Sequence, residues 1–209
     1  IGLENASSIL KNGGVVGMPT ETVYGLAANA YNSEAIAKIF KAKGRPQDNP
    51  LIVHIGTLDT LYEIATDIPK SALLCAEKFW PGPLTMVLKK TDKIPSSVSA
   101  GLSTVAVRMP KNETARQLII KSGLPLAAPS ANTSGSPSPT TANHVINDLD
   151  GKIDAVLMGE DCIVGVESTV ITLAGEHPVL LRPGGVTLEQ LQEILPDITV
   201  SDAVLNQLK

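Results

Sequence analysis

Aromatic residues, cysteines and long apolar runs are all scarce in this sequence, and each shortage excludes a class of protein. Phe, Trp and Tyr make up only 3% of the 209 residues, so the core must be aliphatic, and a hydrophobic content of 43% is enough to build one. No apolar run reaches the roughly 18 residues needed to cross a membrane. No charged and then apolar leader precedes a small-residue cleavage site, so nothing indicates secretion or a membrane partner.

The two cysteines indicate the redox compartment of the protein, and the net charge indicates which kinds of ligand it can bind. Cys75 and Cys162 are far apart and lack the spacing of metal ligands. Unpaired cysteines fit a reducing compartment better than a disulfide framework, so we predict a cytoplasmic protein. A net charge of −4 argues against a broad nucleic-acid surface, which needs a basic stripe. The charge leaves room for one basic pocket that attracts a small anion through its local field.

Common devices for binding phosphate, metal or an acyl group are also missing. The sequence contains no G-x-x-x-x-G-K-[ST] loop, no G-x-G-x-x-G turn, no H-E-x-x-H pair and no G-x-S-x-G elbow. The three histidines are isolated from one another, so we predict no protein metal site. A phosphate ligand would have to be held by arginine, lysine and hydroxyl side chains.

What the sequence does contain is a dense run of polar signals within residues 19–55. The apolar residues 15–18 predict a strand that opens into Thr-Glu-Thr at positions 20–22, a cluster of side-chain oxygens. Asn32 is a plausible N-cap for an amphipathic helix that follows. The end of that helix carries four cations in eight residues, namely Lys38, Lys41, Lys43 and Arg45.

These cations have two interpretations. Lysine and arginine in a last helical turn are favoured by the helix dipole and are usually solvated. However, Gly44 and Pro46 flank Arg45, so turn chemistry fixes its backbone. We therefore expect hydroxyls at a strand end and cations at a helix end to form an anion site.

Two further arginines follow apolar strands. Arg108 ends VAVRMP and Arg182 ends VLLRPGG, each with a proline near the strand end. Strand ends in α/β sheets commonly present ligand-binding side chains, and an arginine there can bind a carboxylate or phosphate through two parallel hydrogen bonds. The alternative for either one alone is an arginine that reaches solvent from a sheet edge. The repeated pattern favours an anion site shared with Lys43 and Arg45.

Other polar residues have a functional and a structural interpretation. The hydroxyl-rich segment 129–141 has the composition of a surface connector, but it follows a buried strand directly, so Ser130 and Asn132 should project from that strand end. His54 alternates within LIVHI and is typical of a half-buried histidine. Ser168 begins a strand, where local capping is the usual role of a hydroxyl.

The order of predicted elements favours one α/β domain. Strands and helices interleave without a repeat or a change in composition, and links too short for a helical crossover predict antiparallel pairing near the end. The predicted helices cover residues 3–10, 34–43, 58–65, 69–79, 112–123, 141–151 and 187–194. The predicted strands cover residues 15–18, 51–55, 84–88, 104–109, 124–128, 155–158, 168–173 and 179–181.

Several motifs together resemble the YrdC family, the threonylcarbamoyl-adenylate synthases. The similar stretches are PTETVYGL, the Lys43-x-Arg45 pair, NPLIVHI, TVAVRMP, PLAAPSAN and VESTVI, which run in the family's order from about Gly13 to Gly185. The resemblance implies a single YrdC-like domain over residues 1–195, with a twisted mixed parallel and antiparallel sheet and flanking helices around a positively charged cavity. It leaves residues 196–209 as a tail, or as the start of a linker to the second domain that longer members carry.

The resemblance also implies a reaction and its partners. Family members make threonylcarbamoyl-adenylate and pyrophosphate from L-threonine, bicarbonate or CO2, and ATP, and a separate transferase puts the product on tRNA. Mg²⁺ is expected to bind through the ATP phosphates. By resemblance, Lys43 and Arg45 are catalytic. The implied ATP contacts are Lys43, Arg45, Asn49, Thr104, Ser130, Asn132, Ser138 and Arg182. The implied threonine contacts are Thr22, His54, Arg108, Ala128 and Ser168.

Two other functions are weighed against this one. An RNA-binding module is disfavoured by the net charge and the six aromatic residues, because basic stripes and stacking platforms are missing, and direct tRNA binding is therefore doubtful. A carbamoyl-adenylate-forming enzyme of the hydrogenase-maturation type resembles the chain over one module only.

Overall fold

The computed structural model describes residues 1–44 and 49–207. The strands are β1 (Val16–Met18), β2 (Gly25–Asn29), β3 (Ile52–His54), β4 (Ala65–Thr66), β5 (Leu84–Lys90), β6 (Thr104–Arg108), β7 (Leu126–Ala127), β8 (Ala155–Val156), β9 (Thr169–Thr172), β10 (Val179–Arg182) and β11 (Thr199–Val200). The helices are α1 (Leu3–Lys11), α2 (Ser33–Lys43), α3 (Leu58–Ile64), α4 (Lys70–Phe79), α5 (Ser96–Ser99), α6 (Glu113–Ser122), α7 (Ala142–Leu149), α8 (Leu188–Gln192) and α9 (Asp202–Gln207).

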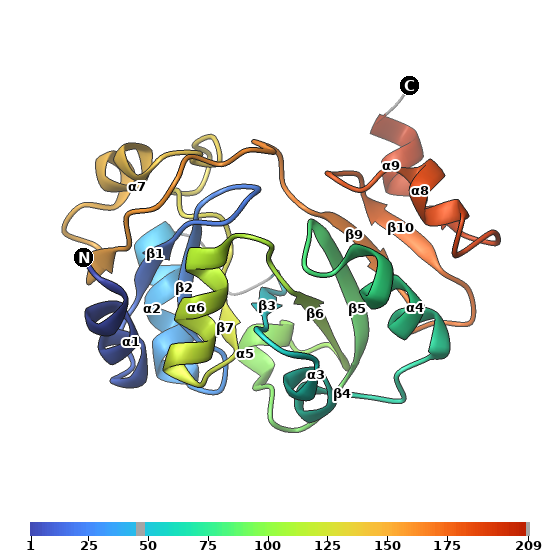
Figure 1. The fold of residues 1–209 in the computed structure, drawn as a ribbon, viewed down its shortest axis with the longest axis horizontal. Coiled ribbons are helices and arrows are strands. Elements are labelled where there is room, and N and C mark those ends of the chain that lie inside the picture. The colour runs from blue at the N-terminus through green and yellow to red at the C-terminus, as the bar shows by residue number, and fades with distance from the viewer. Residues whose placement is uncertain (45–48, 208–209) are drawn as a thin grey trace.

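One mixed sheet runs through the molecule (Figure 1). Its order is β11-β10-β9-β5-β6-β3-β7-β2-β1-β8, with β4 paired to β5 outside this path. The pairs β3–β6 and β5–β9 are parallel, whereas β9–β10, β5–β6 and β3–β7 are antiparallel. The predicted mixed sheet in one α/β domain is confirmed. The antiparallel pairing predicted near the end of the chain holds for β9 and β10, whereas β8 pairs with β1 in parallel.

Local sequence signals set several element ends. The Asn32 side chain accepts hydrogen bonds from the backbone N–H groups of Glu34 and Ala35, which caps α2 as predicted. Gly44 ends the same helix in the left-handed conformation, with φ of 66°. Thr187 and Gln190 form a capping box at the start of α8, where the predicted helix 187–194 begins.

The core is aliphatic, and both faces of the sheet are covered around β2. Leu26 and Ala28 of β2 belong to the main hydrophobic cluster, whereas the intervening Ala27 belongs to a second cluster with α1 and α6. Because alternate residues of a strand face opposite sides, β2 is buried on both faces. No helix in the described ranges is long and apolar enough to span a membrane.

Three regions differ from the sequence prediction. The strand β2 was not predicted, because GLAAN is neither alternating nor rich in β-branched residues. The segment 91–103, which lies outside the predicted helices and strands, contains the short helix α5. The weakly patterned tail contains β11, which pairs with β10 in parallel, and α9.

A long segment without regular structure joins the two sides of the molecule. We call residues 157–168, which connect β8 to β9, the strap. In Figure 1 the strap is drawn in orange and crosses along the upper edge of the view. It is held by a hydrogen bond from the Val164 N–H to the Glu21 carbonyl, and by one from the Cys162 N–H to the Thr140 carbonyl.

Candidate functional site

A cavity of about 240 Å³ lies along β3. Alternate residues of this strand, Ile52 and His54, line it, whereas Val53 between them is buried in the main core cluster. The parallel pairing of β3 with β6 places His54 beside Arg108. The lining residues are Thr20, Thr22, Val23, Gly25, Asn49, Pro50, Ile52, His54, Arg108, Ala128, Pro129, Ser130, Glu167, Ser168 and Arg182.

The cavity brings together many of the residues that the sequence singled out. All five residues of the implied threonine set line it, and so do Asn49, Ser130 and Arg182 of the implied ATP set. Arg108 and Arg182 end β6 and β10, and Ser168 directly precedes β9. The strand ends that were predicted to share a site therefore do converge.

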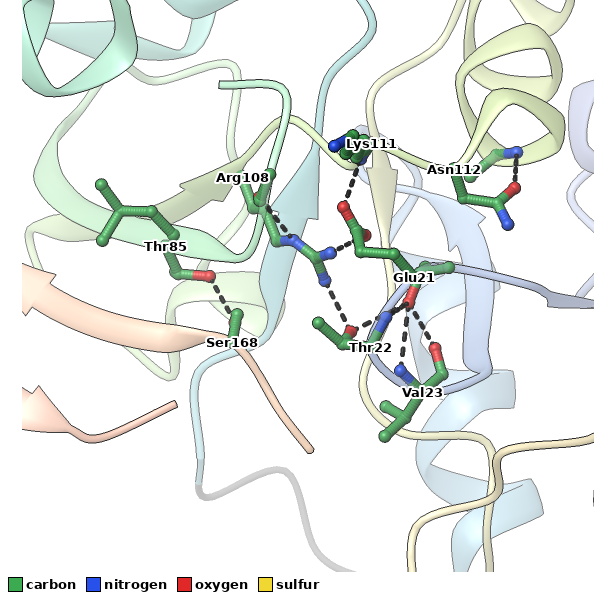
Figure 2. A network of polar contacts seen from close by, with 12 residues as sticks. Glu21, Thr22, Val23, Thr85, Arg108, Lys111, Asn112 and Ser168 are labelled. Carbon is green, nitrogen blue, oxygen red and sulfur yellow. Dashed lines mark hydrogen bonds and ion pairs between the residues drawn. The ribbon is translucent and has the colours of Figure 1, made fainter. Parts of the chain in front are cut away.

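Arg108 is the most buried cation of the cavity, with a side chain only 4% exposed. Its Nε donates to the Gly82 carbonyl at 3.2 Å, its Nη1 donates to Thr22 Oγ1 at 2.9 Å, and its Nη2 forms an ion pair with Glu21. Figure 2 shows the guanidinium between these partners. Burial lowers the pKa of Arg108, while the Glu21 carboxylate acts in the opposite direction. Arginine nevertheless remains charged.

Arg182 has a second, more open environment. Its Nε and Nη2 donate to the Ser168 carbonyl at 3.0 and 2.8 Å, and its Nη1 lies 2.6 Å from Oε2 of Glu167. The other Glu167 oxygen accepts a hydrogen bond from Ser138 Oγ at 2.9 Å. Glu167 thus connects two residues of the implied ATP set, Ser138 and Arg182.

The predicted excess of positive charge in the cavity stays a prediction. Among the described residues, Arg108 is paired with Glu21, and Arg182 is paired with Glu167. An anionic ligand would meet two arginines whose charges are already partly balanced.

His54 is a neutral group in the cavity wall. Burial, and next the charge of Arg108, lower its pKa to about 3. Its Nδ1 is buried and has no hydrogen-bond partner among the described residues. The expectation of a half-buried histidine is wrong, since His54 is only 4% exposed, and a polar ligand group could form a hydrogen bond with Nδ1.

Lys43 connects the first predicted motif to the hydroxyl-rich loop. It is buried, and its Nζ donates to the backbone carbonyls of Ser130 and Asn132 at 2.5 and 2.8 Å. The Ser134 N–H donates back to the Lys43 carbonyl at 2.9 Å. Because the side chain and the backbone carbonyl of Lys43 both form hydrogen bonds with the 129–141 segment, the start of that segment is held in place and is not a loose connector.

Some predicted site residues do not line this cavity. Thr104 begins β6, so it lies about 13 Å along the strand from Arg108. Lys43, Asn132 and Ser138 lie outside the lining and reach it through Ser130 and Glu167. Arg45 lies outside the described residues, and its role stays a prediction.

Glu167 is a cavity residue that the sequence prediction left out. It directly precedes Ser168 in VESTVI, and that adjacency to a strand-start hydroxyl was the available signal. In the described ranges, no group of three or more His, Cys, Asp and Glu side chains forms a metal-binding cluster.

Comparisons with known proteins give this site a family context. The Sua5/YciO/YrdC family model, described as telomere recombination, matches residues 8–184. A protein of Pyrococcus abyssi named threonylcarbamoyl-AMP synthase is 51% identical over 199 residues, which is 95% of this chain and 58% of that protein. A Bacillus subtilis protein of the same name is 50% identical over 206 residues, which is 98% of this chain and 60% of that protein.

Solved structures agree with the sequence comparisons. The crystal structure of P. abyssi Sua5 complexed with L-threonine superimposes with a TM-score of 0.95 at 50% identity, covering 97% of this chain and 60% of that one. The chain thus spans about six tenths of the length of the relatives described here.

Proposed function

Because the chain belongs to the Sua5/YciO/YrdC family, we propose that it is a nucleotidyltransferase that makes threonylcarbamoyl-AMP and pyrophosphate from L-threonine, bicarbonate or CO2, and ATP. One observation carries the proposal, namely the convergence of Thr22, His54, Arg108, Ala128 and Ser168 on a single cavity that also contains Arg182. The names of the relatives at about half identity support the same reaction.

The proposed chemistry matches the residue types in the site. The threonine amine adds to CO2 and loses a proton to give a carbamate. A carbamate oxygen then attacks the α-phosphorus of ATP, and pyrophosphate leaves. This sequence needs no covalent protein intermediate, so the protein's part is to position two substrates and to stabilise developing phosphate charge.

Threonine would bind at the buried end of the cavity. Arg108 is suited to its carboxylate, because a guanidinium can form two parallel hydrogen bonds with a carboxylate. Thr22 and Ser168 offer hydroxyls for the polar groups of threonine, and the free Nδ1 of His54 offers one more position. Ala128 closes this part of the wall without adding charge.

ATP would bind toward the more open Arg182. Asn49, Ser130 and Arg182 line the cavity, and Ser138 donates a hydrogen bond to the lining residue Glu167. We propose that Lys43, Arg45, Thr104 and Asn132 complete the nucleotide site. Mg²⁺ would bind to the phosphate oxygens of ATP and neutralise their charge, because Mg²⁺ prefers oxygen ligands.

The product would pass to a separate transferase that modifies tRNA, and we place the reaction in the cytoplasm. The two cysteines are present as free thiols, which supports a reducing compartment. An RNA-binding role for the chain itself is an alternative that a tRNA-binding isotherm at several salt concentrations would test.

The test is pyrophosphate release by this 209-residue chain from ATP and Mg²⁺. We expect release only when both L-threonine and bicarbonate are present. Release with carbamoyl phosphate in place of those two substrates would instead indicate a carbamoyl-adenylate-forming enzyme of the hydrogenase-maturation type. A folded protein that releases no pyrophosphate under either condition would contradict the proposal for this chain.

A further inference from the structure

Glu21 is a buried acid next to the cavity that does not line it. Its side chain is only 7% exposed, and it is absent from the cavity wall that contains Arg108. One carboxylate oxygen pairs with Nη2 of Arg108, and the other accepts the Lys111 N–H at 2.5 Å. Figure 2 shows Glu21 between the guanidinium and the Lys111 backbone. Glu21 therefore lies behind the arginine as seen from a ligand.

The contacts of Arg108 fix the plane of its guanidinium. The group has five N–H donors, and three of them donate to Gly82, Thr22 and Glu21 from three different nitrogens. Within the described part of the chain, one N–H on Nη1 and one on Nη2 therefore remain for a ligand. Those two N–H groups can meet a carboxylate only if the guanidinium is held in one orientation.

The backbone around Glu21 is itself anchored. The Val164 N–H of the strap donates to the Glu21 carbonyl at 2.8 Å, and the Lys111 N–H comes from the turn after β6. Two chain segments, the strap and the end of β6 with the turn after it, thus contact Glu21. An acid held in this way can transmit a fixed geometry to Arg108.

We propose that Glu21 is a positioning residue for the carboxylate-binding site, acting through Arg108. The inference rests on the proposed function, because it takes L-threonine as the carboxylate ligand. By charge alone, an acid beside Arg108 would weaken the binding of an anion. Positioning predicts the opposite, that removing the acid weakens binding, so the sign of the effect distinguishes the two roles.

The experiment is L-threonine binding by isothermal titration calorimetry to the whole chain, comparing wild type with Glu21→Gln. The amide keeps the shape of the side chain but can accept only one of the two hydrogen bonds with its single oxygen. We expect threonine affinity to fall by about 30-fold or more, which is the lower end of the range for one lost partner of a buried charged contact. ATP affinity, measured in the same way, should fall less than threonine affinity, because Glu21 contacts Arg108 and the Lys111 N–H, whereas Arg182 is paired with Glu167.

The matched control is Glu4→Gln, which removes the carboxylate of an ion pair to Lys121 whose acid is 86% exposed. Its threonine affinity should equal that of wild type. Unchanged or tighter threonine binding by a folded Glu21→Gln would overturn the inference and leave the proposed function standing. A wild-type chain that binds no threonine would overturn the proposed function, and this inference with it.

Two further variants separate positioning from a merely structural role. Glu21→Asp keeps the charge but is one methylene shorter. Positioning predicts that this variant binds threonine more weakly than wild type, whereas simple charge balance predicts the wild-type threonine affinity. This variant also serves if Glu21→Gln fails to fold. In an Arg108→Ala background, Glu21→Gln should change the KM for threonine by less than about twofold, because it acts through the missing arginine. A large further change there would contradict the inference.

Discussion

At the scale of single residues, each of the two arginines that line this site is paired with an acid. Arg108 pairs with Glu21 and Arg182 pairs with Glu167. Removing one partner of a buried pair typically costs about 3–5 kcal/mol, because the remaining charge is left without compensation. Removing one partner of the buried Arg108–Glu21 pair should therefore lower stability as well as change the site. The half-exposed Arg182–Glu167 pair is screened by solvent and contributes less to stability.

His54 predicts a pH dependence of stability. Its pKa is about 3 in the folded protein, below the ordinary value of 6.5, so the unfolded chain binds the extra proton first as pH falls. The contribution of neutral His54 to the free energy of unfolding is complete above pH 6.5. As pH falls from 6.5 toward 3, the free energy of unfolding decreases by about 1.4 kcal/mol per pH unit. When the free energy of unfolding is measured with urea between pH 4 and 7 and plotted against pH, the slope should be shallower for His54→Gln than for wild type.

The control for this experiment is His177→Gln, because His177 is exposed. Its plot of unfolding free energy against pH should match that of wild type, since an exposed substitution away from the site changes stability little. Identical slopes for His54→Gln and wild type would show that His54 does not titrate in this way.

At the scale of elements, the site depends on the junction between β9 and β10. Gly184 follows the end of β10, and a Cβ there would lie 2.4 Å from the Glu167 carbonyl oxygen and 2.4 Å from the Thr169 N. This contact between two backbone segments holds Ser168 against Arg182. Glycine is needed here for close approach rather than for an unusual φ.

Gly184→Ala should therefore lower both stability and activity. Because the nearest atoms are backbone, the two strand ends must separate, and the cost of such overpacking is about 1–3 kcal/mol. Thermal unfolding and pyrophosphate release measure the two effects. Gly175→Ala is the matched control, since its Cβ would meet no atom within 4 Å, and it should change stability by less than about 0.5 kcal/mol. Equal behaviour of the two variants would contradict the role of this junction.

At the scale of the whole molecule, one sheet and one main core connect both sides of the protein. The sheet is continuous from β11 to β8, and the main cluster includes residues from Val15 to Ile198. The strap adds further hydrogen bonds to other segments, from Val164 to Glu21 and from Cys162 to Thr140. The cavity thus lies within one cooperative unit rather than between two.

This continuity predicts a single unfolding transition. Trp80, the one tryptophan of the sequence, is buried and donates from Nε1 to the Leu84 carbonyl at 2.7 Å, so its fluorescence reports the β5 region. Urea midpoints from Trp80 fluorescence and from far-ultraviolet circular dichroism should coincide. A separate earlier transition by either probe would show that part of the sheet unfolds independently.

Much of the fold was predictable because its signals are local. Asn32 acts within one helical turn of its own position, so a capping rule located the start of α2. The strands that end in Arg108 and Arg182 were also found, because apolar runs stop at a charge followed by proline. The strand β2 was missed because burial on both faces removes alternation, and β11 was missed because its partner β10 is some twenty residues away.

The sequence by itself determined the α/β class, the aliphatic core, the family motifs and the polar residues at strand ends, since each depends on residues close together in the chain. Only the tertiary structure decided that Arg108 meets Glu21 across 87 positions, that Lys43 holds the carbonyls of Ser130 and Asn132, and that His54 is neutral. Ion pairing and desolvation depend on distances between segments and on burial, which the pairing of β3 with β6 and the path of the strap establish and which no local pattern contains.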